Sequence, residues 1–274
     1  MHKSDDDPKI KIMQCDKELS KDLEHIEAWI NKAKNLLELK MHGEALQCTE
    51  TALLCAKNNI EKKILLNLRG DIYVDLKQWS NAIKSYSEIL VFDPANINAL
   101  NYTGFSHMSL DEHEIAIASF SEVLKNDDRD VMALDNIGRC YKVEKKFNIA
   151  LEYLEKSIKL ETWDHNRFAL QEMLEIYFND IEDYEKADSI AERLINEHPD
   201  EHYAFLIKGL ILGKQKKYEE SLVFYKQALQ IKNLKISSVD HILFQLGFTY
   251  ALLKKPELSN IYYNSITEDY FDFA

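Results

Sequence analysis

The chain has 274 residues, of which 46% are hydrophobic and 30% are charged, and its formal net charge is −13 at pH 7. Acidic residues are spread along the whole chain, so its surface repels nucleic acid and anionic lipid, and we expect neither as a partner. No apolar run approaches the roughly 18 residues of a membrane span, and the opening residues lack the apolar core of a secretory signal, so we expect no membrane insertion.

Residues 1–19 are charged, contain Pro8 and show no steady hydrophobic period, so we predict a flexible N-terminal arm there. Ser20 is the expected N-cap of the first long helix, because Asp22 and Glu24 then place negative charge in its opening turn. The folded part of the chain is therefore expected to begin at residue 20.

The clearest pattern lies between Lys63 and Pro94, where apolar residues recur three and four apart on both sides of a break at residues 77–80. This spacing predicts two amphipathic helices joined by a tight turn. With Lys63 counted as position 1, residues of characteristic size stand at positions 8, 11, 17, 20, 24 and 32: Gly70, Tyr73, Trp79, Ala82, Tyr86 and Pro94. This order resembles the tetratricopeptide repeat, a helix–turn–helix unit of 34 residues.

Residues of similar size stand at the same positions when this 34-residue numbering is started again further along the chain. The resemblance implies an all-α, right-handed α-solenoid of about seven stacked repeats. We expect these repeats at residues 26–62, 63–96, 97–130, 131–164, 165–201, 202–235 and 240–267. The fifth is the loosest, because it has no glycine at position 8 and its turn is one residue longer. Residues 20–267 are thus predicted to form a single solenoid.

Five of the seven glycines fall at position 8, inside predicted helices: Gly70, Gly104, Gly138, Gly209 and Gly247. Glycine inside a helix costs about 1 kcal/mol relative to alanine. We therefore expect two helix backbones to approach closely at each glycine, with the small residue at position 20 as the other half of the contact.

Residues 268–274 form an acidic and aromatic C-terminal tail after the last predicted helix. Repeat arrays normally cover their final apolar face with a polar helix. Either the tail folds over that face or another molecule covers it, and a homodimer through the C-terminal end is the second possibility.

The four cysteines, at positions 15, 48, 55 and 140, lie on predicted helices or in the N-terminal arm. Cys48 and Cys55 are two turns apart on one predicted helix, which is too far for a disulfide. We expect reduced thiols and a cytoplasmic location.

The family resemblance implies a concave groove, lined by the first helices of successive repeats, mostly at positions 2, 5, 6, 9, 12 and 13. The candidate peptide-binding residues at such positions are mostly polar in the early and middle repeats and apolar or aromatic in the later ones. They are Asn67, Asp71, Asn101, Phe105, Asn136, Arg139, Lys142, Phe168, Tyr203, Leu206, Leu210, Phe244 and Phe248.

Asparagine amides can donate to and accept from a peptide backbone, and Arg139 and Lys142 can hold a carboxylate. Arg139 has an alternative structural role, since Asp135 and Glu175 are both candidate ion-pair partners. The aromatic residues likewise have two interpretations, as anchors for a ligand or as contacts between consecutive helices.

One functional subclass of the family can be excluded from its residues. Co-chaperones that bind the acidic C-terminus of heat-shock proteins carry a clamp of Lys or Asn, Asn, and Lys or Arg in three successive repeats. Counted from the first repeat, the corresponding positions hold Ile30, Lys34, Leu68, Asn98 and Tyr102. These residues do not match, and other starting points fit no better.

We find no pattern typical of catalysis, of a cofactor or of a metal. His198, Glu201 and His202 cluster near a proline, but they lie across a repeat junction and no further ligand follows at a suitable spacing. His107 occupies the place of a packing aromatic residue, which favours a buried structural role. No glycine-rich phosphate loop or Gly-x-Ser-x-Gly motif occurs.

The resemblance therefore implies a non-enzymatic, cytoplasmic adaptor or chaperone-like protein that binds a peptide segment of another protein in its concave groove. Two alternatives remain open. One is a regulatory protein that responds to a ligand or peptide in the groove. The other is a homo-oligomeric accessory of assembly or secretion.

Overall fold

The computed structural model describes residues 7–160 and 166–267, and all their regular elements are helices. The sequence predicts one array over residues 20–267, and in the structure the chain divides into two compact units, Met1–Lys145 (unit 1) and Lys146–Ala274 (unit 2). A repeat array permits such a division, because each repeat contacts only its neighbours and no central core joins distant ones.

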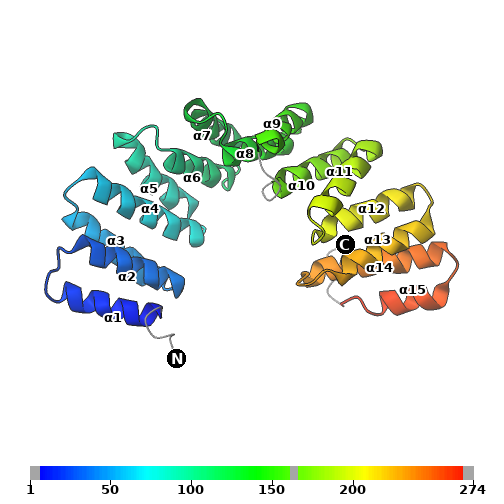
Figure 1. The fold of residues 1–274 in the computed structure, drawn as a ribbon, viewed down its shortest axis with the longest axis horizontal. Coiled ribbons are helices and arrows are strands. Elements are labelled where there is room, and N and C mark those ends of the chain that lie inside the picture. Colours follow the sequence, from blue (N-terminus) through cyan, green and yellow to red (C-terminus); the bar gives the residue numbers. More distant parts are fainter. Residues whose placement is uncertain (1–6, 161–165, 268–274) are drawn as a thin grey trace. The chain divides into compact units, whose positions relative to one another are not determined.

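Unit 1 is a stack of helices in which each packs on the one before it. The helices of one pair lie side by side and antiparallel (Figure 1). Its elements are α1 (Pro8–Leu19), α2 (Ile26–Glu38), α3 (His42–Cys55), α4 (Asn59–Asp75), α5 (Trp79–Phe92), α6 (Ile97–Met108), α7 (His113–Asn126) and α8 (Val131–Val143).

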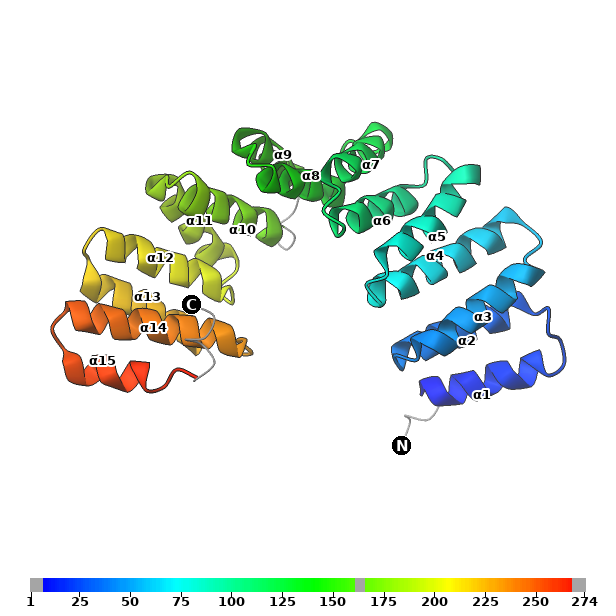
Figure 2. The same cartoon turned by 180° about the vertical axis from the view of Figure 1, so that it is seen from behind.

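Unit 2 continues the same alternation of helices, as the reverse view also shows (Figure 2). Its elements are α9 (Phe147–Leu160), α10 (Arg167–Glu175), the π-helical turn η1 (Ile176–Asp180), α11 (Tyr184–Glu197), α12 (His202–Lys214), α13 (Tyr218–Gln230), α14 (Ile236–Leu252) and α15 (Pro256–Tyr263). The first helices begin at residues 26, 59, 97, 131, 167, 202 and 236, two or four residues from the expected repeat starts in three cases. The predicted all-α solenoid class is confirmed.

The turn inside each pair has one conformation throughout. A residue in the left-handed region, with φ between 56° and 62°, stands two positions before the second helix, and none of these residues is a glycine: Lys40, Lys77, Asp111, Lys145, Glu182, Lys216 and Lys254. Backbone hydrogen bonds close the helix end, for example Lys77 N to Val74 O (2.9 Å) and Gln78 N to Tyr73 O (2.8 Å). This is the usual way in which a helix ends in a left-handed residue.

The fifth repeat accommodates its extra residue inside a helix. Arg167 and Tyr184, the first residues of its two helices, are 17 positions apart, whereas His202 and Tyr218 of the next repeat are 16 apart. The backbone widens into the π-helical turn Ile176–Asp180 at this point. A π-turn is the usual result of one inserted residue, so the left-handed turn keeps its place before the second helix.

The prediction of a flexible N-terminal arm is wrong for residues 7–19, which the structure describes. Residues Pro8–Leu19 form a helix, with the Asp7 side chain accepting from Lys9 N (2.9 Å) and proline in the first turn. Residues 1–6 of the predicted arm lie outside the described residues. Ser20 ends α1 instead of starting the next helix, which begins at Ile26.

The apolar stripe of α1 is narrow, and this is why the sequence did not reveal the helix. Cys15 and Leu19 are buried and Ile12 packs on the core beside α2, while the other positions are mostly charged. Lys32 of α2 pairs with Asp16 (2.6 Å), which adds an ionic contact between the two helices. Tertiary packing on α2 thus stabilises a helix whose own periodicity is weak.

At four of the position-8 glycines, Gly70, Gly104, Gly209 and Gly247, the nearest atoms belong to an aromatic ring and not to the small residue at position 20, so that part of the expectation is wrong there. A Cβ on Gly70 would lie 2.5 Å from Tyr86, and one on Gly104 would lie 2.8 Å from Phe120. The ring at position 24 of the second helix therefore fills the space beside the first helix. Ala82, at position 20, is fully buried next to it.

None of the described helices is both long and apolar enough to cross a bilayer.

Candidate functional site

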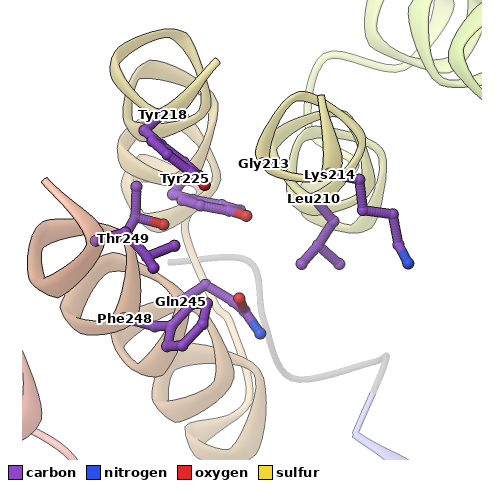
Figure 3. A pocket seen from close by; sticks show the side chains of 9 residues that line it. Leu210, Gly213, Lys214, Tyr218, Tyr225, Gln245, Phe248 and Thr249 are labelled. Atoms are coloured by element: carbon purple, nitrogen blue, oxygen red, sulfur yellow. The ribbon is translucent and has the colours of Figure 1, made fainter. Parts of the chain in front are cut away.

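A largely apolar pocket lies in unit 2, between α12, α13 and α14. We call it the α12–α14 pocket, and it encloses about 190 Å³. Figure 3 shows its side chains converging from the three helices. Its lining consists of Leu210, Gly213, Lys214, Tyr218, Tyr225, Gln245, Phe248, Thr249 and Leu252.

Two predicted groove residues, Leu210 of α12 and Phe248 of α14, both line this pocket, from different helices (Figure 3). Leu210 directly follows Gly209, and Phe248 directly follows Gly247. Because both glycines face an aromatic ring of the second helix in their repeat, the next residue points to a different side of the first helix. Phe248 is 47% exposed, a large fraction for a phenylalanine. The pocket mouth is therefore an apolar surface in contact with water.

The pocket floor is polar but uncharged. Tyr225 and Thr249 are buried, and burial raises the pKa of the Tyr225 hydroxyl above its ordinary value. The phenol is thus a neutral group whose hydrogen bond with Thr249 satisfies it within the protein. Such a floor accepts an apolar side chain without leaving a charge buried.

Aromatic packing holds Phe248 in place. Its ring is stacked on that of Phe244 with centroids 6.4 Å apart and planes 4° apart. Phe244 in turn meets the Tyr263 ring edge-on at 5.8 Å, and Tyr263 is the residue that fills the notch at Gly247. The exposed ring therefore belongs to an ordered cluster that includes the last described helix.

Two nitrogen-bearing side chains flank the apolar lining. Lys214 Nζ lies 4.8 Å from the ring centroid of Tyr184, and its pKa is raised, chiefly by a hydrogen bond with the Tyr184 hydroxyl. Gln245 Nε2 lies 3.3 Å from His241 Nε2. Burial lowers the pKa of His241, so its neutral imidazole can accept from the amide.

A second pocket, of about 250 Å³, lies in unit 1 and brings the predicted residues Phe105 and Arg139 together. The Phe105 ring packs edge-on against Trp79, with centroids 5.8 Å apart and planes at 79°. The remaining lining residues are Met108, Ser109, Asp111, His113 and Val143. This pocket is more polar than the α12–α14 pocket.

The predicted asparagines bond within their own surroundings. Asn67 Nδ2 donates to Lys63 O and Asn136 Nδ2 donates to Met132 O, both at 2.9 Å. Asn101 is only 4% exposed, and its amide donates to Asp130 Oδ2 (3.2 Å). Asn67 and Asn136 remain partly accessible on the first helices of their repeats, whereas Asn101 is a packing residue of α6.

The other candidates in the early and middle repeats have protein partners too. Asp71 Oδ1 accepts from Tyr86 Oη (2.7 Å), and shielding from water is the main reason why the pKa of Asp71 is raised. Arg139 and Lys142 both lie on α8, and each already interacts with other groups of the protein. Arg139 is nevertheless exposed beside the unit 1 pocket.

The remaining candidates in unit 2 differ in burial. Leu206 belongs to the core and offers no surface, while Phe168 is half-buried. Tyr203 is half-buried as well, and burial, with Glu175 as the next contributor, raises the pKa of Tyr203 to about 12. The apolar surface that a ligand can reach in this unit is therefore centred on Leu210 and Phe248.

Sequence reasoning missed several lining residues of the α12–α14 pocket. Lys214, Gln245 and Leu252 stand at positions 13, 6 and 13 of their repeats, so the family positions used above contain the signal for them. Tyr218 and Tyr225 come from a second helix, which was expected to lie away from the groove. No sequence signal points to these two.

No group of three or more His, Cys, Asp or Glu side chains within the described ranges is placed to hold a metal ion. At the junction of the fifth and sixth repeats, where His198, Glu201 and His202 cluster in the sequence, His198 Nε2 lies 2.8 Å from Asn166 Oδ1. Both residues are buried. Glu201 is buried nearby and accepts from Tyr203 N. These contacts join α10 to the α11–α12 connection.

Comparison with known proteins supports the repeat assignment directly. Residues 202–233, which span α12 and α13, match the family model of the tetratricopeptide repeat. Comparison of the sequence with curated proteins gives no significant match.

Solved structures give a likeness of fold. PilF from Pseudomonas aeruginosa is 15% identical, with 79% of this chain and 98% of that chain covered and a TM-score of 0.64. The C-terminal part of a repeat protein from Cytophaga hutchinsonii is 17% identical, covering 89% and 98%, with a TM-score of 0.67. YrrB, a tetratricopeptide-repeat protein with an unusual peptide-binding site, is 16% identical, covering 65% and 88%, with a TM-score of 0.51. The matched residues 202–233 form a tetratricopeptide repeat, and the likeness to these structures shows that the chain has the fold of a tetratricopeptide-repeat solenoid.

Proposed function

We propose that this chain is a non-enzymatic adaptor or chaperone-like protein that binds a peptide segment of another protein, and that the α12–α14 pocket takes an apolar side chain of that peptide. The observation that carries the proposal is that Leu210 and the 47% exposed ring of Phe248 line the same pocket. Ordered aromatic surface beside a pocket is typical of the anchor points of protein interfaces.

The size of the pocket favours an anchor residue over a whole small molecule. Its volume of about 190 Å³ is below the roughly 300–1,000 Å³ of typical cofactor and small-molecule sites. One large apolar side chain projecting from a peptide needs less room. The peptide backbone would then run over the first helices of the repeats, as the family resemblance implies.

The chemistry of the lining supports binding and not catalysis. Tyr225 keeps its proton at neutral pH, because burial raises the pKa of its hydroxyl, and Lys214 is occupied with Tyr184. Neither is a base poised near neutrality, which general acid–base catalysis requires.

The unit 1 pocket is the proposed place for a second, polar contact. Phe105 offers an apolar wall and Arg139 an exposed guanidinium that can meet a carboxylate of the ligand in addition to its present contacts. YrrB, which has a similar fold, is described as having a peptide-binding site, and this supports a peptide as the ligand here.

The proposal is tested by capturing partners from the native host with three forms of the full chain and identifying them by mass spectrometry. Phe248→Ala should weaken the binding of a specific partner by roughly thirtyfold, the usual effect of removing an aromatic anchor worth about 2 kcal/mol. Val223→Ala, at an exposed valine on α13, is the matched control and should change nothing. Equal capture by all three forms would exclude the pocket as the binding site.

Arg139→Glu tests the second contact in the same assay. If the charge is used, this reversal should weaken binding further when it is combined with Phe248→Ala. An unchanged affinity would restrict the site to unit 2.

A homodimer is the second proposal, and one observation favours it. Leu258 and Ile261 on α15 are 40% and 58% exposed, and α15 packs chiefly on α14 among the described helices. A second copy could cover this apolar face. Light scattering over a range of concentrations should then detect a dimer that Ile261→Glu abolishes, and a strict monomer at high concentration would end the proposal.

A cytoplasmic location is also proposed. All four cysteines are free, and Cys15, Cys48 and Cys140 are buried. Free thiols of this kind are usual in reducing compartments. Fractionation of the native host followed by detection of the chain would test it.

A further inference from the structure

We propose that residues 268–274 of this chain occupy the α12–α14 pocket when no partner is bound, so that the chain carries its own competitor for the peptide site. The inference rests on the proposed function of that pocket. Four observations carry it: where the chain is fixed before residue 268, how far seven residues reach, which side chains they bear, and what the pocket offers them.

The chain is fixed to α14 immediately before this segment. Thr267 N donates to Asp240 Oδ1 (3.1 Å), and Thr267 Oγ1 donates to Asp240 Oδ2. Asp240 is buried near the start of α14, and Ile266 is buried beside it. The last described residue, Thr267, is therefore fixed to α14.

From that point the pocket is within reach. Asp240, Phe244 and Phe248 are spaced four residues apart, so they follow one face of α14. Phe248 lies about 12 Å along the helix axis from Asp240, at 1.5 Å per residue. Seven extended residues span up to about 23 Å. The segment can thus lie along Phe244 and place a side chain in the pocket beside Phe248.

The composition of the segment suits the surface that it would meet. It bears three aromatic rings, those of Tyr270, Phe271 and Phe273, and three acidic residues. The rings can pack on the stacked pair formed by Phe244 and Phe248, and a carboxylate can approach the ammonium group of Lys214 at the pocket edge. A segment with aromatic and acidic side chains therefore matches a pocket that has an apolar lining and a lysine at its edge.

The consequence is competition within one molecule. A segment tethered by a short link is present at its own site at an effective concentration in the millimolar range. Even weak docking then keeps the pocket filled, and a partner must displace the segment. The partner peptide is accordingly expected to present an aromatic residue next to an acidic one, as the segment itself does.

Fluorescence anisotropy with a labelled synthetic peptide of residues 268–274 tests the inference on the full chain. The receptor with Tyr270→Ala, Phe271→Ala and Phe273→Ala together should bind this probe at least about tenfold more tightly than the unchanged chain, because its own segment no longer competes. Adding Phe248→Ala should abolish the gain, whereas adding Val223→Ala should preserve it.

Three results would overturn the inference. The first is equal binding of the probe by the unchanged chain and the triple variant. The second is binding to the triple variant that Phe248→Ala does not affect, which would place the segment elsewhere, for example on Leu258 and Ile261 of α15. The third is a dimer of the unchanged chain that the triple variant lacks, which would place the segment in a second copy.

Failure of the inference is distinguishable from failure of the proposed function. Partner capture that depends on Phe248, together with equal probe binding by the two receptors, would leave the proposed function standing without self-competition. Probe binding that depends on Phe248, together with partner capture that does not, would show that the pocket serves the chain's own segment alone.

Discussion

The ring of Tyr225 fills the space that a side chain on Gly209 would need. A Cβ built on Gly209 would lie 2.4 Å from Tyr225 Cε1 and 2.6 Å from Cδ1, closer than real Cβ contacts. Tyr225 is buried among core residues of unit 2 and cannot swing aside without disturbing them. Glycine on the first helix and an aromatic ring on the second are therefore parts of one contact.

Gly209→Ala should consequently lower the free energy of unfolding by about 1–3 kcal/mol, because the added methyl group overpacks the ring. Urea unfolding of the full chain, followed by circular dichroism, measures the change. Gly43→Ala is the control, since no atom lies within 4 Å of a Cβ at that position of α3. The control should be neutral or stabilising by up to about 1 kcal/mol, because it only restricts the unfolded chain. Equal losses in both variants would contradict the proposed contact.

Leu19→Ala tests whether α1 is an integral part of unit 1. Leu19 is buried against the neighbouring helix, so its truncation should cost about 2–5 kcal/mol. Met13, on the same helix, is 71% exposed, and Met13→Ala should change stability by less than about 0.5 kcal/mol. Thermal unfolding compares the two. If the Leu19→Ala variant were as stable as the unchanged chain, α1 would not contribute to the stability of unit 1.

Lys77→Gly should stabilise the protein. Lys77 has φ 56°, a left-handed conformation that costs a residue with a side chain roughly 1–2 kcal/mol. Glycine removes this strain but gives the unfolded chain more freedom, so a net gain of up to about 1 kcal/mol remains. Lys84→Gly, in the interior of α5, should instead destabilise by about 1 kcal/mol. The denaturant concentration at the midpoint of unfolding should rise for Lys77→Gly and fall for Lys84→Gly. Shifts of the two midpoints in the same direction would contradict the prediction.

His241 should make stability depend on pH near neutrality. Burial lowers the pKa of His241 below its ordinary value of 6.5, so the unfolded chain binds a proton that the folded chain does not. This contribution to stability is fully present above 6.5 and is lost as the pH falls through 6.5 towards the folded pKa. Protonation also removes the acceptor that faces Gln245.

The measurement is urea unfolding of the unchanged chain and of His241→Gln between about pH 8 and about pH 5, the range in which histidine titrates. The unchanged chain should lose more unfolding free energy than the variant as the pH falls. Parallel pH profiles would show that burial of His241 does not perturb its titration.

Much of the architecture could be derived from local spacing. The break at residues 77–80 located the turn between α4 and α5, and similar residues return about 34 positions later, because helix period and turn chemistry depend on residues that are close in the chain. Even the extra residue of the fifth repeat was visible as a longer spacing. Leu210 and Phe248 stand at the same position of two successive repeats, so the sequence could name both as candidates for one surface.

Other features depended on which surfaces meet once the helices pack. Four of the glycines at position 8 face a ring sixteen residues later in the sequence, as Gly209 faces Tyr225, and a repeat pattern does not reveal which of several small or aromatic residues fills a gap. α1 forms because α2 covers its narrow stripe, and Leu206 is buried while Phe244, at the same position of the next repeat, is only half-buried. Periodicity assigns a side chain to a face of its helix, but only the neighbouring helices settle how much of that face water can still reach.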